Sequence, residues 1–386
     1  METKRDAQRF IDDLKLGRLS RRDFHRGLAS VGLGLVSLPA FSRHVRAAEE
    51  HPVLYTWAGY EVPEMHQEYI DKYGESPPYT LWGDEEEAEA KMRAGFKPDV
   101  AMPCSYKVKK WSDFDFLKPI DTSRLSHWGD VIEPLKNVPD MVIDGNRLMV
   151  CAWWGLTSVT FRTDLAPEYV DPATHTWGVL WDPKYKGRLS MIDSLIDGVM
   201  VAAIYSGAKD PFDMTKAEVE RVKELMVEQR PLLRFYTNSQ TEWEQALAAG
   251  EVVAAASWNG TITRLREDGL PVAFMSPKEG PMTWTCGLVL MSFVSPERED
   301  RAYDLINAFL APTTGEWWIM TQGMGHSNRN AFDLVFGKHG GDVLAARGLP
   351  SDPEGIEEFL AGGIFQATIQ NEPELQAMYE EVKAGF

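Results

Sequence analysis

A tryptophan followed by an Asn-Gly break is the first feature of this sequence that suggests binding chemistry. Residues 251–260 read E-V-V-A-A-A-S-W-N-G, which predicts a short buried strand that ends at Trp258 and breaks at Asn259-Gly260 before a helix. Open α/β sheets bind ligands beyond the carboxyl ends of their strands, where helix N-termini face the crevice. We therefore expect Trp258 to face a cleft. The simpler interpretation, a Trp that plugs a core strand, is more common for one Trp taken alone.

Residue types that carry covalent catalysis or metal binding are present but not arranged for it. The eight His show no metal-ligand spacing, and there is no G-x-S-x-G motif, P-loop or Rossmann fingerprint. The acidic run at residues 84–87 suits the first turn of a helix better than a cation site. We expect a protein that is not an enzyme and that has no cofactor or metal.

The elements that would position Trp258 alternate between strand and helix. In the first part of the chain we expect strands at 53–57, 78–82 and 99–102, and helices at 63–73, 84–95 and 106–114. Alternation resumes with a strand at 188–192 and helices at 198–206, 215–228 and 240–249. Such alternation predicts a parallel sheet covered on both faces.

Two long extended runs interrupt this alternation. Residues 147–162 and 285–293 each read as a strand with a Gly inside it, long enough to leave one lobe and enter another. Two crossing strands of this kind form a hinge, which is typical of proteins that close two domains around a ligand.

Composition and charge narrow the class further. A chain of 386 residues with 44% apolar composition can bury a large core and form two lobes. The first 47 residues carry ten Lys/Arg and five Asp/Glu, so the remainder has a formal charge of −23 against −18 for the whole chain. An acidic body without a basic stripe argues against nucleic acid as a partner.

The N-terminal 47 residues have the order of an export signal. Ser20-Arg21-Arg22-Asp23-Phe24 precedes an apolar run of 15 residues, too short to span a bilayer, and then a small-residue site at Val45-Arg46-Ala47. The paired Arg21 and Arg22 resemble the twin-arginine signal. The alternative is a basic amphipathic helix on a surface, although the apolar run lacks a polar face. We expect a mature protein from about residue 48 that folds in the cytoplasm and works, soluble, in the periplasm.

Six short segments match the motifs of one known family, in the same order and at similar spacing. They are Y-T-W-A-G-Y at 55–60, P-D-V-A-M-P-C-S-Y at 98–106, W-W-G-L-T at 153–157, W-D-P-K-Y-K-G at 181–187, W-N-G at 258–260 and G-L-V-L at 287–290. Over nearly the whole mature chain the sequence resembles the bacterial spermidine/putrescine-binding family, the periplasmic receptors of ABC importers. Family membership determines fold better than ligand.

The resemblance implies an α/β, two-lobed periplasmic binding protein fold (type II), with the ligand cleft between the lobes and a hinge of crossing strands. We expect lobe 1 at 48–156 and 287–312, and lobe 2 at 157–286 and 313–386. The expected partners are a small cationic or zwitterionic ligand and an ABC permease and ATPase at the inner membrane. The ligand-binding residues that the resemblance implies are Trp57, Tyr60, Tyr106, Trp258, Trp284 and Gln366.

The carboxylates of polyamine receptors are mostly missing. Gly59 stands at one acidic position, Ser194 and Asp197 stand where an acid pair is expected, and Cys286 stands at another acidic position. Primary ammonium groups would be desolvated and poorly paired in such a pocket, at a cost of several kcal/mol. Cys104 and Cys286 fall at cleft-lining positions and could lie near each other, which leaves a disulfide open, but we interpret them as small apolar wall residues.

Aromatic walls with few acids suit a methylated onium ligand. Quaternary ammonium and sulfonium groups donate no N–H, and each aromatic face supplies roughly 0.5–2 kcal/mol of cation–π attraction. We expect an onium zwitterion such as dimethylsulfoniopropionate or a betaine, with its carboxylate near the hydroxyls of Ser105 and Tyr106 or near helix N–H groups. The alternative is a polyamine or diamine paired with Asp193, Asp197, Glu242 or Glu244.

Overall fold

The computed structural model describes residues 50–385 of the chain. Every strand and helix described below lies in one compact unit that begins at Pro52. The predicted signal, with Arg21 and Arg22, lies outside the described residues. No helix within them combines the length and the apolar character that crossing a bilayer requires.

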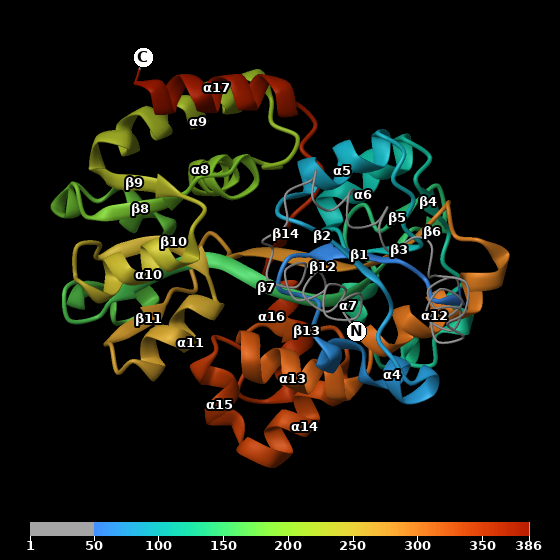
Figure 1. The fold of residues 1–386 in the computed structure, drawn as a ribbon. Helices are drawn as coiled ribbons and strands as arrows, with labels where there is room; N and C mark the ends of the chain where they lie inside the picture. The colour runs from blue at the N-terminus through green and yellow to red at the C-terminus, as the bar shows by residue number, and fades with distance from the viewer. Residues whose placement is uncertain (1–49, 386) are drawn as a thin grey trace, which may run out of the picture. The chain divides into compact units, whose positions relative to one another are not determined.

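Twelve strands of this unit form one mixed sheet (Figure 1). Its main path runs β2-β1-β3-β12-β7-β10-β8-β9, with β4, β11, β13 and β14 attached to the two long strands, and β5 and β6 form a separate hairpin. The strands are β1 (Leu54–Trp57), β2 (Tyr79–Trp82), β3 (Val100–Ala101), β4 (Leu117–Lys118), β5 (Val142–Ile143), β6 (Asn146–Arg147), β7 (Met149–Arg162), β8 (Leu189–Ile192), β9 (Leu233–Thr237), β10 (Ala254–Trp258), β11 (Val272–Phe274), β12 (Met282–Met291), β13 (Gly325–His326) and β14 (Ile364–Phe365).

The predicted parallel pairing is confirmed at the two ends of this sheet. β1 pairs in parallel with β2 and β3, and β8 pairs in parallel with β9 and β10. The long strands β7 and β12 are antiparallel to each other, and each runs antiparallel to the outer strand beside it. The sheet is therefore mixed, because the two strands that cross between its halves run in opposite directions.

Helices cover the sheet around these strands (Figure 1). Side-chain caps begin several of them: the Asp84 carboxylate accepts the Glu87 N–H at 2.7 Å ahead of α5, and Thr215 and Glu218 form a capping box ahead of α9. The α-helices are α4 (Gln67–Tyr73), α5 (Glu85–Arg93), α6 (Ser105–Asp113), α7 (Glu133–Lys136), α8 (Met200–Ser206), α9 (Lys216–Gln229), α10 (Gln240–Ala248), α11 (Gly260–Glu267), α12 (Pro296–Phe309), α13 (Pro312–Gln322), α14 (Arg329–His339), α15 (Gly341–Ala346), α16 (Ile356–Ala361) and α17 (Glu372–Ala384).

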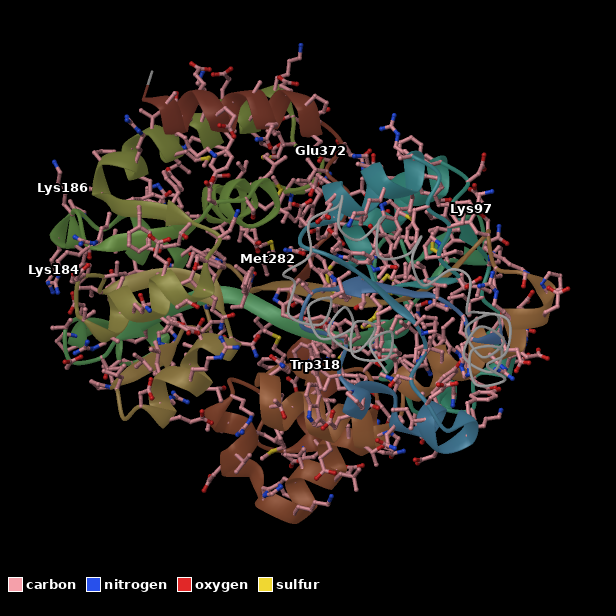
Figure 2. The ribbon with its side chains drawn as sticks, viewed as in Figure 1. Lys97, Lys184, Lys186, Met282, Trp318 and Glu372 are labelled. Carbon is pink, nitrogen blue, oxygen red and sulfur yellow. A yellow bond between two sulfur atoms is a disulfide. The ribbon has the colours of Figure 1, made fainter. Side chains whose placement is uncertain are left out.

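Two hydrophobic cores lie on either side of the crossing strands. The first contains Leu54, Trp111 and Leu305, and the second contains Trp177 and Trp243. This is the two-lobed α/β fold of a periplasmic binding protein, with β7 and β12 as the crossing strands. Met282, at the start of β12, lies where that strand passes between the lobes, while Lys97 and Lys184 lie at the outer edges (Figure 2).

Residues 313–361 pack in the first core, although the sequence placed them in the second lobe. Trp318 of α13 contacts Tyr60 and Trp153, with ring centroids 5.3 and 4.8 Å apart, and Phe332 of α14 stacks on Trp154. These partners hold the segment against the first-lobe half of β7. Of the C-terminal helices only α17 contributes side chains to the second core. The chain thus crosses between the lobes a third time, between β14 and α17.

Candidate ligand-binding site

A cavity of about 390 Å³ opens between the two lobes. Side chains from both lobes line it, at the ends of β1 and β10, in the first half of β12 and at the starts of α6 and α10. The lining residues are Trp57, Tyr60, Cys104, Tyr106, Ile196, Asp197, Gln240, Trp258, Arg264, Trp284, Cys286, Gln322, Met324 and Gln366.

Seven of the eight site residues predicted from the sequence line this one cavity, and Ser105 does not. The Ser105 side chain is fully buried, its hydroxyl donates to the Gln366 carbonyl at 3.3 Å, and it accepts from Thr285 Oγ1 at 3.0 Å. The predicted use of Ser105 for a ligand carboxylate therefore fails on geometry. That the other seven residues bind a ligand stays a prediction.

The aromatic walls are held by contacts behind them. The Trp57 indole N–H donates to the Met102 carbonyl at 2.9 Å, and its ring meets Trp82 edge to face. Tyr60 packs edge to face on Trp153 and Trp318, and burial raises the pKa of its hydroxyl to about 12. The Trp57 and Tyr60 side chains are each half-buried, so part of each remains available to the cavity.

The two tryptophans from β10 and β12 are positioned by small or polar neighbours. The predicted strand end and helix start at Asn259-Gly260 are confirmed, and Trp258 meets Trp243 edge to face at 5.2 Å. Trp284 lies directly over Gly155 of β7, where an added Cβ would come within 2.1 Å of Trp284 Cζ2. The buried Trp284 indole N–H has no partner among the described residues.

Asp197 contributes the carboxylate of this cavity and is 6% exposed. It follows the Ser194 cap of a π-helical turn, η8 (Leu195–Val199), in which Ser194 Oγ accepts the Asp197 N–H at 3.1 Å. The carboxylate accepts hydrogen bonds from Thr157 Oγ1 at 2.8 Å, Ser194 Oγ at 3.1 Å and Gln366 Nε2 at 3.3 Å. Burial raises the pKa of Asp197, and the Thr157 and Ser194 hydrogen bonds oppose that shift.

A guanidinium also lines the cavity, which the sequence had not suggested. Arg264 of α11 places Nη1 3.5 Å from Glu244 Oε1, and Gln240 Nε2 donates to the same oxygen at 2.7 Å. The two carboxylates that the sequence offered as substitutes, Glu242 and Glu244, are not among the lining residues. Glu242 instead accepts the Thr237 hydroxyl.

Cys104 and Cys286 form a disulfide in the cavity wall, whereas the sequence suggested two apolar wall residues. The bridge joins the residue that caps α6 to β12, at a point where their backbones also form an isolated antiparallel bridge. It thereby ties the start of the helix that carries Tyr106 to the strand that carries Trp284. Cys151 is buried and has no disulfide partner.

A second carboxylate lies behind the aromatic wall. Glu85 is 2% exposed, accepts the Cys104 N–H at 2.7 Å and hydrogen-bonds with the Tyr106 hydroxyl. Burial raises its pKa to about 7, while Lys107 lowers it. Sequence reasoning missed Glu85 because its acidic run looked like an ordinary helix start. The sequence does not show that Glu85 lies against Cys104, which follows β3 and is distant from Glu85 in the chain.

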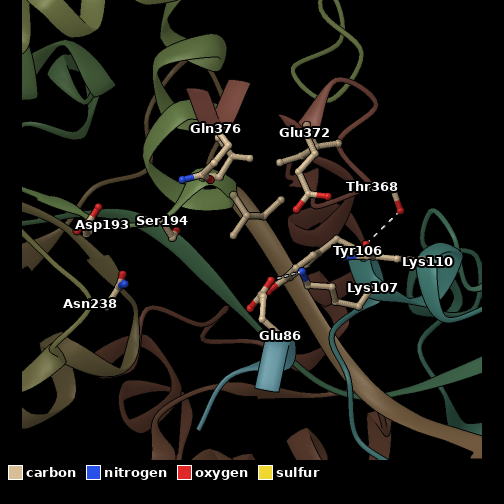
Figure 3. A pocket seen from close by; sticks show the side chains of 13 residues that line it. Glu86, Tyr106, Lys107, Lys110, Asp193, Ser194, Asn238, Thr368, Glu372 and Gln376 are labelled. Carbon is tan, nitrogen blue, oxygen red and sulfur yellow. Dashed lines mark hydrogen bonds and ion pairs between the residues drawn. The ribbon is translucent and has the colours of Figure 1, made fainter. Parts of the chain in front are cut away.

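A smaller cavity of about 290 Å³ shares Tyr106 and Ile196 with the first (Figure 3). Its charged side chains are already paired in part: Lys107 contacts Glu86, and Asp193 contacts Lys383 at 2.8 Å. Asp193, a carboxylate that the sequence offered for a polyamine, therefore serves this neighbouring cavity and the Lys383 contact. Among the described residues no group of His, Cys, Asp and Glu is arranged to hold a metal ion.

Two lobes joined by crossing strands, with a cavity between them, are the architecture of a solute-binding protein. Residues 81–340 match the family of bacterial extracellular solute-binding proteins, and the chain belongs to that family.

Named relatives and solved structures agree with this assignment. The spermidine/putrescine-binding periplasmic protein of Salmonella typhimurium is 26% identical over 340 residues, 86% of this chain and 91% of the relative. Spermidine/putrescine-binding periplasmic protein 1 of Haemophilus influenzae is 25% identical over 289 residues, 74% of this chain and 77% of the relative. The spermidine/putrescine ABC transporter substrate-binding protein of Streptococcus pneumoniae has the same fold, with a TM-score of 0.69, 18% identity and coverage of 86% and 97% of the two chains.

Proposed function

We propose that this chain is the solute-binding protein of an ABC importer and that it captures a small organic cation in the inter-lobe cavity. The observation that carries the proposal is Asp197, a buried carboxylate set among five aromatic side chains that line the same space. A positive group beside Asp197 would exchange water for a carboxylate and for aromatic faces. The ligand would then be handed to a permease and ATPase at the membrane, as an ABC importer requires.

The relatives favour a polyamine or diamine over the methylated onium compound predicted from the sequence. They are named for spermidine and putrescine, and they match most of this chain. The onium compound stays a second candidate because of one observation: Asp197 is the one carboxylate among the described residues that line the cavity. A ligand with two or more ammonium groups would leave its further charges without a direct carboxylate there.

Titration calorimetry on the protein and on Asp197→Asn tests both candidates, with putrescine, spermidine and dimethylsulfoniopropionate as ligands. If a diamine or polyamine is the ligand, the variant loses roughly 2 kcal/mol or more of binding free energy, because a desolvated ammonium loses its partner. If an onium compound is the ligand, Trp258→Ala costs more than Asp197→Asn, about 1–3 kcal/mol. Failure of every cation to bind, or tight binding that changes in neither Asp197→Asn nor Trp258→Ala, would refute the proposal.

The relatives are periplasmic proteins, and we propose the periplasm as the site of action here too. Export by the twin-arginine route stays a prediction, since Arg21 and Arg22 lie outside the described residues. Replacing both by Lys should strand the precursor in the cytoplasm, because Lys lacks the planar guanidinium geometry. Cell fractionation measures this, and Lys4→Arg with Lys15→Arg serves as a control that leaves the pair intact. An unchanged periplasmic yield in the double Lys variant would argue for another route.

A further inference from the structure

The polar groups of the inter-lobe cavity fall into two separate clusters. Asp197 and Gln366 are joined by a hydrogen bond and come from η8 and the segment after β14. Arg264 and Gln240 meet at Glu244 and come from α11 and α10. No hydrogen bond or ion pair joins the two clusters within residues 50–385.

The second cluster is rich in donors with unused capacity. A guanidinium has five N–H groups, and in the described part of the chain Arg264 makes one long contact, to Glu244 at 3.5 Å. The Arg264 side chain is 48% exposed, whereas that of Glu244 is 14% exposed and does not line the cavity. Gln322, the last residue of α13, lines the same cavity with an amide.

The end groups of the candidate ligands differ in what they offer this second cluster. A fully protonated polyamine offers N–H donors and no acceptor. Such a ligand would offer the Arg264 guanidinium no acceptor, whereas a carboxylate oxygen would accept hydrogen bonds from it.

Charge balance points the same way. Within residues 50–385, two charged side chains line the cavity: the carboxylate of Asp197 and the guanidinium of Arg264. Glu85 lies behind Tyr106 and does not line the cavity. A dication would place a second positive charge in a lining of zero net charge, while a zwitterion would meet an opposite charge at each end.

We propose that Arg264, supported by the amides of Gln240 and Gln322, binds a carboxylate of the ligand, so that the transported solute is a small zwitterion. The inference rests on the proposed cation site at Asp197 and narrows the ligand from organic cations to amines or onium compounds that also carry a carboxylate. It departs from the polyamines for which the relatives are named.

A matched pair of ligands tests this directly. Putrescine and 4-aminobutyrate share a four-carbon chain and differ in one end group, ammonium against carboxylate, and dimethylsulfoniopropionate adds a methylated zwitterion. We expect the protein to bind at least one zwitterion about tenfold or more tightly than putrescine, as loss of a charge-assisted contact would predict. Tighter binding of putrescine, or no binding of either zwitterion, would overturn the inference.

Variants separate this inference from the proposed function. Arg264→Gln should weaken zwitterion binding about tenfold or more and leave putrescine unchanged or tighter. Arg234→Gln makes the same charge change at an exposed residue that pairs with Glu251 outside the cavity, and should change neither. Equal loss for both ligands, or no loss, in Arg264→Gln would overturn the carboxylate site, with thermal melting as the check on folding. If Asp197→Asn abolishes putrescine binding while Arg264→Gln changes the binding of no ligand, the proposed cation site stands and the inference is refuted.

Discussion

At the scale of single residues, Asp197 is an acid held in a place that disfavours its charge. Desolvation raises its pKa above the ordinary value of 3.8, while the Thr157 and Ser194 hydroxyls partly restore the charged form. A cation in the cavity would favour the charged form further. Ligand capture and proton release from Asp197 are therefore linked under acidic conditions.

This linkage has a definite sign. A cation binds the ionised carboxylate, so affinity should be constant above the raised pKa of Asp197 and fall as the pH drops through it, by up to about tenfold per pH unit below it. Dissociation constants measured across the acidic range check this, with Asp197→Asn as the reference. If the variant shows the same acid-side loss as the unaltered protein, another group is responsible.

At the scale of elements, the site depends on how closely β7 and β12 approach. Trp284 of β12 packs against Gly155 of β7, and an added Cβ at Gly287 of β12 would come within 2.0 Å of the Val150 carbonyl. The register of the pair shifts between Cys286 and Gly287, where a bulge interrupts it. Glycine at these two positions allows the strands to carry an aromatic wall and still cross between the lobes.

Gly155→Ala should therefore displace Trp284 and lower both ligand affinity and stability. The new methyl group would clash with the indole, which costs about 1–3 kcal/mol on relaxation, and we expect affinity to fall about tenfold. Gly337→Ala in α14 is the matched control, because nothing lies within 4 Å of its added Cβ. Calorimetry and thermal melting measure the two effects. Unchanged affinity in Gly155→Ala would show that the indole can move without consequence.

Several of these elements were predictable because local pattern and packing agree. The strand that ends at Trp258, the break at Asn259-Gly260 and the long runs that became β7 and β12 all follow from periodicity and glycine placement. Arg264 and Glu85 were not predictable, because their roles depend on which distant helices meet. Residues 313–361 were misassigned because only the aromatic partners of Trp318 reveal the lobe to which they belong.

At the scale of the whole molecule, three segments join the lobes: β7, β12 and the chain that follows β14. The third contains Gln366, which donates to Asp197 and thus connects a linker directly to the proposed cation site. Relative motion of the lobes would have to bend all three segments together. We therefore expect a hinge motion with few intermediate positions.

Ligand should compact the protein by closing the lobes over the cavity, since only closure removes the remaining water from the ligand. Small-angle scattering of the free and saturated protein measures the change as a smaller radius of gyration. Asp197→Asn in the presence of the same ligand concentration serves as the control and should keep the open profile. Identical profiles for free and saturated protein would contradict a closing hinge.

The disulfide in the cavity wall has a consequence for the order in which this protein folds, is exported and is oxidised. A chain exported already folded would leave a reducing compartment with Cys104 and Cys286 as thiols. Because both cysteines line a cavity that opens to solvent, an oxidant that enters the cavity would meet them after folding is complete. Maturation would then finish outside, with the last covalent bond made in the place that the solute later occupies. A solute that arrives before oxidation would cover that bond-forming site.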